Sequence, residues 1–250
     1  MRLGDATWPE VDGIARRRTD GRTDGRTESA VPAPILLIPV GSTEQHGPHL
    51  PLATDTIIAE ELAGRAVHRT DGLMIGPTIS VSASGEHADF PGTLSIGSAV
   101  TTSVIVELVR SADWSAGVVL VNGHGGNHAA ISEAVAIVTA EGRRALAWSP
   151  KWPQRRDGGP ADLHAGRIET SMMLAIDPGL VRLELAERGA DATIAELRDR
   201  GVRAVSASGV LGDPDGASGR EGERFITAFV ADLVHQIERW RPLDPAGTDS

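Results

Sequence analysis

The chain of 250 residues contains no cysteine. Disulfides, thiolate metal sites and a cysteine nucleophile are therefore excluded, and any bound metal must be held by histidine, aspartate and glutamate. No stretch approaches the roughly 18 consecutive apolar residues of a membrane span, and no basic segment followed by an apolar run resembles a targeting signal. We therefore expect a soluble, cytoplasmic protein.

Clustered positive charge is also lacking. The chain has 24 Lys and Arg against 34 Asp and Glu, a formal net charge of -10. Because phosphate groups are bound by clustered basic side chains, neither nucleic acid nor an anionic membrane is an expected partner. Three arginines, Arg16 to Arg18, open a run of TDGR repeats without an apolar face. This composition predicts a mobile loop over residues 16–30 rather than a nucleic-acid patch.

Short apolar runs alternate with helical patterns along most of the remaining chain. This alternation predicts a single α/β domain over residues 1–250 with a mostly parallel sheet. Strands are expected at 35–40, near 73–82, at 117–122 and at 143–150, and helices at about 55–68, 100–112 and 193–200 and up to Trp240. The N-terminal LGDATWPEV is expected to be turn-like with Trp8 as its anchor, and residues 203–212 to be extended.

The stretch ILLIPVGSTEQHGPHLPLATD, residues 35–55, concentrates groups that bind metals. In an extended backbone, residues two apart point to the same side, so Glu44 and His46 can face one ion while Gln45 points away. Asp55 lies where a helical pattern begins, which would hold its carboxylate at a helix start. A plain helix cap is the alternative for Asp55.

A second candidate turn follows the strand GVVLVN. Loops at the carboxyl ends of parallel strands open on the same edge of a sheet, so His124 in the turn NGHGGN should approach Glu44 and His46. The rival interpretation is a phosphate or nucleotide binder that uses the NGHGG backbone as an anion site. The order of the glycines is neither that of a dinucleotide fingerprint nor that of a P-loop.

Four further polar residues are candidates. Glu86 and His87 are neighbours in a Gly- and Pro-containing loop, would point opposite ways in extended backbone, and are expected on the substrate side. His164 ends a loop, and Glu169 lies in the first turn of a helix beside apolar residues. A carboxylate in such surroundings needs a partner, which a metal would supply. A surface glutamate favoured by the helix dipole is the alternative.

The blocks GSTEQHGPHLPLATD, EHADFPGTLSIG, NGHGGN and HAGRIETSMM, in this order, resemble the creatininase family of metal-dependent amidohydrolases. The resemblance implies a creatininase-like three-layer αβα fold, with helices on both faces of a mostly parallel central sheet. It also implies a homo-oligomeric, hexamer-like assembly, and two divalent ions per subunit that are bridged by one aspartate. Side chains without sulfur suit zinc, iron(II) or manganese.

Residues of this chain can be matched to the family's ligands by position. Glu44, Asp55 and His124 match the ligands of one ion, and His46 with the shared Asp55 matches those of the other. Creatininase has an acidic ligand where this chain has Gly126, and we assign that vacancy to Glu169. His164 matches a family histidine near the reacting group, which implies proton transfer to the leaving amine or positioning of the intermediate.

Within the family, LGDATWPEV, the ASGEH block and VRAVSASGVLGDPDGA most resemble peptidases that trim a ribosomally made precursor peptide. The resemblance implies a modified precursor peptide as substrate and release of a C-terminal Val-Tyr dipeptide. A metal-bound water with a pKa near about 7 would be the nucleophile. A formamide deformylase or a cyclic amidohydrolase of the same family is the alternative. Trp148 and Trp152 have no secure match to the tryptophans of the creatininase pocket, so creatinine is not the expected substrate.

Overall fold

Four strands form one parallel sheet in the computed structural model of this chain, which describes residues 1–16, 33–152 and 162–241. The strand order is β2-β1-β3-β4, and every neighbouring pair is parallel. The strands are β1 (Ile35–Val40), β2 (Leu73–Ile75), β3 (Gly117–Asn122) and β4 (Ala145–Trp148). All six residues of β1 and of β3 are buried, as expected of central strands that are covered on both faces.

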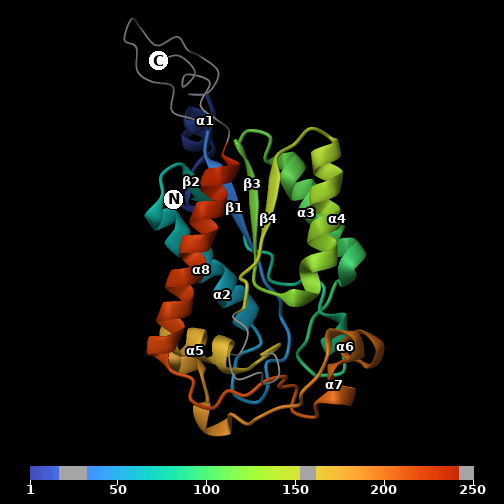
Figure 1. Cartoon of the computed structure of the whole chain (residues 1–250). Coiled ribbons are helices and arrows are strands. Elements are labelled where there is room, and N and C mark those ends of the chain that lie inside the picture. The colour runs from blue at the N-terminus through green and yellow to red at the C-terminus, as the bar shows by residue number, and fades with distance from the viewer. Residues whose placement is uncertain (17–32, 153–161, 242–250) are drawn as a thin grey trace, which may run out of the picture.

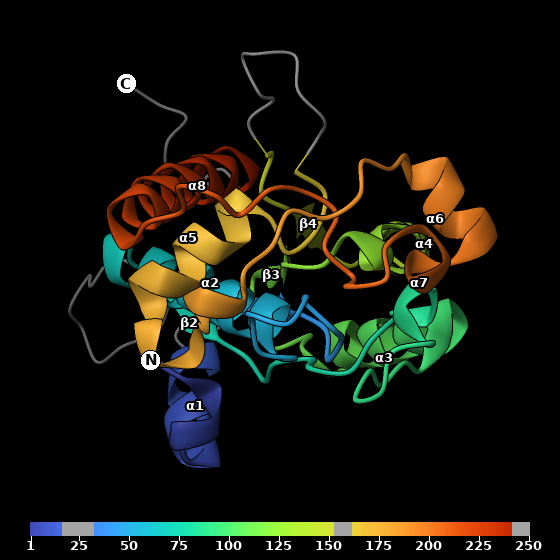
Figure 2. The same cartoon turned by 90° about the horizontal axis from the view of Figure 1, so that it is seen from below.

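Helices cover both faces of the sheet (Figures 1 and 2). One face packs against α2 (Thr54–Arg69), α5 (Arg167–Ile176) and α8 (Gly219–Trp240), and the other against α3 (Gly97–Ser111) and α4 (His128–Ala140). Successive residues of β1 serve the two cores in turn, because side chains alternate across a strand. Leu37 lies in the core with α8, and Ile38 lies in the core with α3. The expected three-layer αβα architecture is confirmed.

The N-terminal segment differs from its predicted turn. It forms a short 3-10 helix, Leu3–Asp5, and then helix α1 (Trp8–Arg16). Glu10 accepts hydrogen bonds from the backbone N–H and the hydroxyl of Thr7, both at 2.7 Å, as a carboxylate does at a helix start. Trp8 is 78% exposed, so its prediction as an anchor was wrong. Arg16 ends this helix, and residues 17–30 of the expected loop lie outside the described residues.

In the segment after α5, one predicted helix is confirmed and one predicted extended stretch is wrong. Helix α6 (Ile194–Arg200) starts at Thr193, whose side chain and that of Glu196 form a capping box. Residues expected to be extended begin instead with a short helix, α7 (Val202–Val205). Only Leu211 of that region makes a bridge, to His164. A single domain over residues 1–250 stays a prediction.

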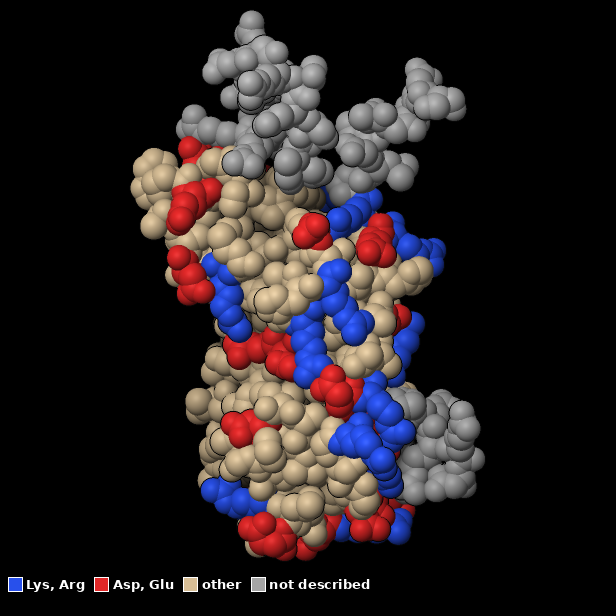
Figure 3. Space-filling model, turned by 90° about the vertical axis from the view of Figure 1, so that its left-hand side faces the viewer, with Lys and Arg blue, Asp and Glu red and all other residues tan. Residues whose placement is uncertain are grey.

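Charges of both signs lie side by side on the face that carries α8 (Figure 3). Arg65 of α2 pairs with Glu61 at 2.6 Å and also with Glu223 of α8, and Arg167 pairs with Glu221 at 2.7 Å.

None of the helices in the described ranges has both the length and the apolar character that crossing a bilayer requires.

Close packing of α5 against α8 depends on Gly222. A Cβ atom at this position would lie 1.9 Å from the backbone oxygen of Ser171. We expect Gly222→Ala to push the helices apart and lower the free energy of unfolding by about 1–3 kcal/mol, seen as a lower Tm. Gly64→Ala is the matched control, because a Cβ there meets nothing within 4 Å. It should raise stability by about 0.5–1 kcal/mol through helix propensity. Equal effects would contradict the packing argument.

Candidate metal centre

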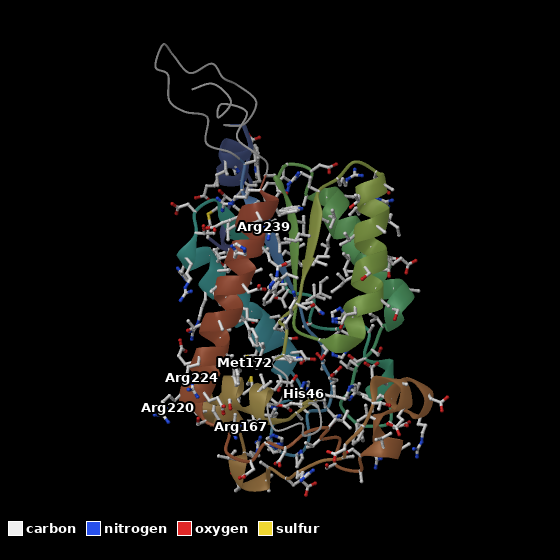
Figure 4. All side chains as sticks on the ribbon, viewed as in Figure 1. His46, Arg167, Met172, Arg220, Arg224 and Arg239 are labelled. Atoms are coloured by element: carbon white, nitrogen blue, oxygen red, sulfur yellow. The ribbon has the colours of Figure 1, made fainter. Side chains whose placement is uncertain are left out.

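The candidate residues meet at the carboxyl edge of the sheet. Val40 and Asn122, the last residues of β1 and β3, are register partners, so the loops that follow start side by side. One loop carries Glu44 and His46 and the other carries His124. Figure 4 shows His46 at this end of the sheet, near α5. The predicted convergence of the two turns is therefore observed, for the reason given by parallel topology.

Asp55 lies between two histidines. Its Oδ1 is 3.0 Å from His46 Nε2, and its Oδ2 is 3.1 Å from His124 Nδ1. The Ser42 hydroxyl also donates to Oδ2, at 2.8 Å. Asp55 sits in the first turn of α2 but is not its cap, which is Ala53. One carboxylate oxygen for each histidine is an arrangement that suits a bridge between two cations.

Glu44 is fully buried, and neither of its carboxylate oxygens has a hydrogen-bond partner. His124 Nε2 lies 3.2 Å from Glu44 Oε2, too poorly aligned to count as a hydrogen bond. Glu44, Asp55 and His124 offer ligand atoms that all lie within 4.8 Å of one another. Because an unpaired buried carboxylate is costly, this group fits a cation.

A second group consists of His46, His164 and Glu169, whose ligand atoms also lie within 4.8 Å of one another. Glu169 is only 8% exposed and accepts a hydrogen bond of 2.6 Å from the backbone N–H of Ala165. Ala165 has a φ of 53°, in the left-handed region that is strained for a residue with a Cβ. This turn brings His164 and Glu169 to the same site, and the alternative of a surface glutamate is wrong.

Both ligand histidines are oriented by backbone carbonyl groups. His46 Nδ1 lies 3.1 Å from the carbonyl oxygen of Glu44, and His124 Nε2 lies 2.9 Å from that of Ala83. Since a carbonyl oxygen can only accept, these nitrogens carry the proton and donate. His46 Nε2 and His124 Nδ1 are thereby left facing Asp55, in the orientation that a metal-binding histidine adopts.

The electrostatics of the metal-free site favour positive charge. Burial alone would lower the pKa of His46, but Asp55 and Glu169 raise it to about 9. Burial likewise opposes charge on His124, yet Glu44 and Asp55 hold its pKa well above the ordinary value. Burial raises the pKa of Glu169 to about 8. Without metal, protons on His46 and His124 neutralise the nearby carboxylates. Bound metal ions would take over that role.

Glu86 and His87 both approach the site, contrary to the expectation for extended backbone. They lie in a 3-10 helix, Gly85–His87, which changes the direction of successive side chains. His87 Nε2 is 3.4 Å from Glu44 Oε1, and Glu86 Oε1 is 3.7 Å from His124 Nε2. A Cβ atom at Gly126 would lie 2.4 Å from Glu86 Oε1. Glu86 therefore occupies space that a side chain at position 126 would fill.

Sequence reasoning missed two structural roles in the site. Gln45 was expected to point away, but its amide contacts the rings of His87 and His164. Asn127 precedes α4 yet makes no side-chain cap; its amide donates to Gly41 O at 3.0 Å and accepts from Ala83 N at 3.2 Å. Asn127 thus ties together the loops after β1, β2 and β3. Neither role has a sequence signal, because the partners are distant in the chain.

Trp148 and Trp152, which have no secure match to the creatininase pocket, both contact α8. Trp148 is buried and donates from Nε1 to Asp232 of α8 at 2.8 Å. Trp152 packs edge-on against Phe229, also of α8, with ring centroids 5.4 Å apart. Both rings therefore belong to the core under α8.

A known family model and a curated relative each match most of this chain. The family model described as Creatinine amidohydrolase matches residues 23–237. The mycofactocin precursor peptide peptidase of Mycolicibacterium smegmatis is 46% identical over 220 residues, covering 84% of this chain and 86% of that protein.

Solved creatininase structures share the fold. A manganese form and a zinc-zinc form of a mutant each have a TM-score of 0.76 and 25% identity, and each match covers 96% of this chain and 98% of the other. By the extent of the family match and by the identity to its relatives, this chain is a member of the creatininase family.

Proposed function

We propose that this chain is a divalent-metal-dependent peptidase of mycofactocin biosynthesis, which removes a C-terminal Val-Tyr dipeptide from the modified precursor peptide. The observation that carries the proposal is the meeting of two buried ligand groups on either side of Asp55. The substrate is supported by the 46% identity to a relative that is named for it.

Five side chains are proposed to hold two ions. Glu44, Asp55 and His124 would hold one, and His46, Asp55 and Glu169 the other. Bound there, divalent ions supply Lewis acidity and a nucleophilic water at neutral pH. Zinc, iron(II) and manganese all suit this set of oxygen and nitrogen ligands. The related structures include zinc and manganese forms.

His164 is proposed to transfer the proton. Its Nε2 donates to the carbonyl oxygen of Gln45 at 2.7 Å, which fixes the ring and leaves Nδ1 facing Glu44 at 3.8 Å. Burial and the nearby His46 and His87 keep the pKa of His164 well below its ordinary value, so the ring is neutral and Nδ1 has a free lone pair. It can accept a proton from the attacking water and pass it to the leaving amine.

Glu86 and His87 are proposed to contact the substrate. Glu86 is 28% exposed, whereas its neighbours in the site are buried, so it lies where the site meets solvent. His87 is buried behind it, beside Glu44. A peptide end that approaches from solvent would meet Glu86 first and His87 next.

The test uses the metal-loaded chain and the synthetic modified precursor peptide. We expect mass spectrometry to show a shortened peptide together with free Val-Tyr, and we expect chelation of the metal to stop the reaction. Creatinine and a formamide serve as comparison substrates for the alternative hydrolases. An intact precursor with the fully loaded enzyme, or cleavage that is indifferent to chelation, would contradict the proposal.

The geometry gives less support to an anion binder. Three backbone N–H groups of the NGHGG turn and its following residue already donate within the protein: Gly123 to Val40 O, His124 to Asn122 Oδ1 and Asn127 to His124 O. An anion nest needs such groups to be available to the ligand.

A cytoplasmic location and a homo-oligomeric, hexamer-like assembly stay predictions.

A further inference from the structure

The side chain of Gln45 is buried between two histidines that are not among the five proposed ligands. Its Nε2 lies 2.8 Å from His87 Nδ1, 3.1 Å from His164 Nε2 and 3.2 Å from Gly209 O. The three contacts come from the loop after β2, the loop before α5 and the segment after α7. Gln45 is thus the point at which three distant segments meet behind the candidate metal centre.

The orientation of the Gln45 amide follows from its other end. The backbone N–H of Gly47 lies 2.9 Å from Gln45 Oε1, and an N–H group can only donate. The oxygen must therefore face Gly47, which leaves the NH2 group facing the histidines. That group has two hydrogens to donate and no lone pair to accept with.

The hydrogen bonds of Gln45 place one proton on each ring. The NH2 group of Gln45 can only donate, so a ring nitrogen that is hydrogen-bonded to it must be bare and accept. The backbone oxygen of Gln45 accepts from His164 Nε2 at 2.7 Å, so the N–H of His164 is at Nε2. The 3.1 Å contact between this nitrogen and the Gln45 NH2 group then joins two donors and is not a hydrogen bond. His87 Nδ1 accepts from the Gln45 amide at 2.8 Å, so the N–H of His87 is at Nε2.

The two rings approach the same carboxylate. His87 Nε2, which carries the N–H, lies 3.4 Å from Glu44 Oε1 without a hydrogen bond to it, and His164 Nδ1 lies 3.8 Å from the same oxygen. The ring centroids are 4.5 Å apart. The N–H of His87 and Nδ1 of His164 therefore lie next to each other at one side of the site.

We propose that Gln45 is a positioning residue whose side-chain amide holds His87 as a hydrogen-bond donor, while its backbone carbonyl fixes the ring of His164. The role of this positioning in catalysis rests on the proposed hydrolysis. As the water oxygen bonds to the amide carbon, its proton moves to His164 Nδ1 and then to the amine nitrogen when the C–N bond breaks. His87 keeps its N–H and stabilises the negative charge on the carbonyl oxygen.

The first test reads the tautomers directly, without substrate. In the zinc-loaded full-length chain with ¹⁵N-labelled histidine, the protonated and bare ring nitrogens have separate chemical shifts. We expect His87 to be protonated at Nε2 and His164 also at Nε2. Gln45→Glu keeps the shape and the acceptor for Gly47 but can no longer donate, so His87 should switch its proton to Nδ1. A bare Nε2 on wild-type His87, or unchanged tautomers in the variant, would overturn the proposal.

The second test separates positioning from folding. For Gln45→Glu we expect kcat to fall by about 10²-fold, as after loss of one oxyanion donor, with zinc content and KM little changed. Gln236→Glu is the control, since it adds the same charge on α8, where Gln236 bonds to Asp232. If Gln45→Glu does not fold, Gln45→Met removes the donor without adding charge, and His87 should lose its single tautomer. An unchanged kcat in a folded variant would contradict the proposal.

The two proposals fail in different ways. If wild-type enzyme shows the expected tautomers but does not cleave the precursor peptide, the proposed substrate is wrong while the assignment of Gln45 stands. If it cleaves the peptide but the tautomers differ, the role of Gln45 is wrong and the peptidase function stands.

Discussion

Replacing Asp55 by asparagine is expected to remove both metal ions and nearly all peptidase activity. Each Asp55 oxygen faces a different histidine, at 3.0 Å and 3.1 Å, so one carboxylate serves both proposed ions. The amide has the same size but no charge, and one of its two ends can only donate. We expect less than one metal per chain by elemental analysis and a fall in kcat/KM of roughly 10³-fold, since metal catalysis is worth several kcal/mol.

Ser42→Ala is the matched control for Asp55. It removes the hydrogen bond of 2.8 Å to Asp55 Oδ2 and leaves the carboxylate in place. Metal content should stay close to wild type, with a much smaller loss of activity. Two metals and full activity in Asp55→Asn would show that the site is not built around this carboxylate.

Replacing His164 by alanine is expected to lower kcat by about 10²–10⁴-fold, the range typical of general acid–base groups. Its Nε2 is occupied by the carbonyl oxygen of Gln45, and only Nδ1 faces the site. We therefore expect the metal content to stay at the wild-type level. Elemental analysis and cleavage of the precursor peptide measure the two quantities on the same preparation.

Glu169→Gln provides the comparison for His164→Ala, because both residues belong to the group with His46. For Glu169→Gln, bound metal should fall toward one per chain. If His164→Ala loses metal in the same way, His164 is a ligand, and its proposed role in proton transfer is wrong.

The sheet could be predicted because its strands are continuous apolar runs. Residues 35–40 and 117–122 are the observed bounds of β1 and β3, and both strands are buried on two faces. Such runs have no amphipathic period that could be confused with a surface helix. Parallel topology then places the turns with His46 and His124 on one edge, which is why residues so far apart could be expected to meet.

Errors were concentrated where the outcome depends on short-range geometry or distant partners. The helix starting at Trp8 depends on a capping contact between Thr7 and Glu10. The convergence of Glu86 and His87 depends on one 3-10 turn. In each case a change of a few backbone angles reverses the direction of a side chain. The apolar periodicity of the sequence contains no information on these angles.

The amino-acid sequence was enough to predict the α/β class, the parallel strands and the set of histidines and carboxylates at the edge of the sheet. The apolar pattern predicts the strands because buried strands consist of apolar residues. Residue type predicts the site because only histidine, aspartate and glutamate could hold a metal in this chain. The position of Gln45 between His87 and His164, and the nitrogen of each ring that carries the proton, follow from the folded chain and not from the residue pattern. A tautomer is set by the hydrogen-bond partners of the ring, and these come from segments that folding alone brings together.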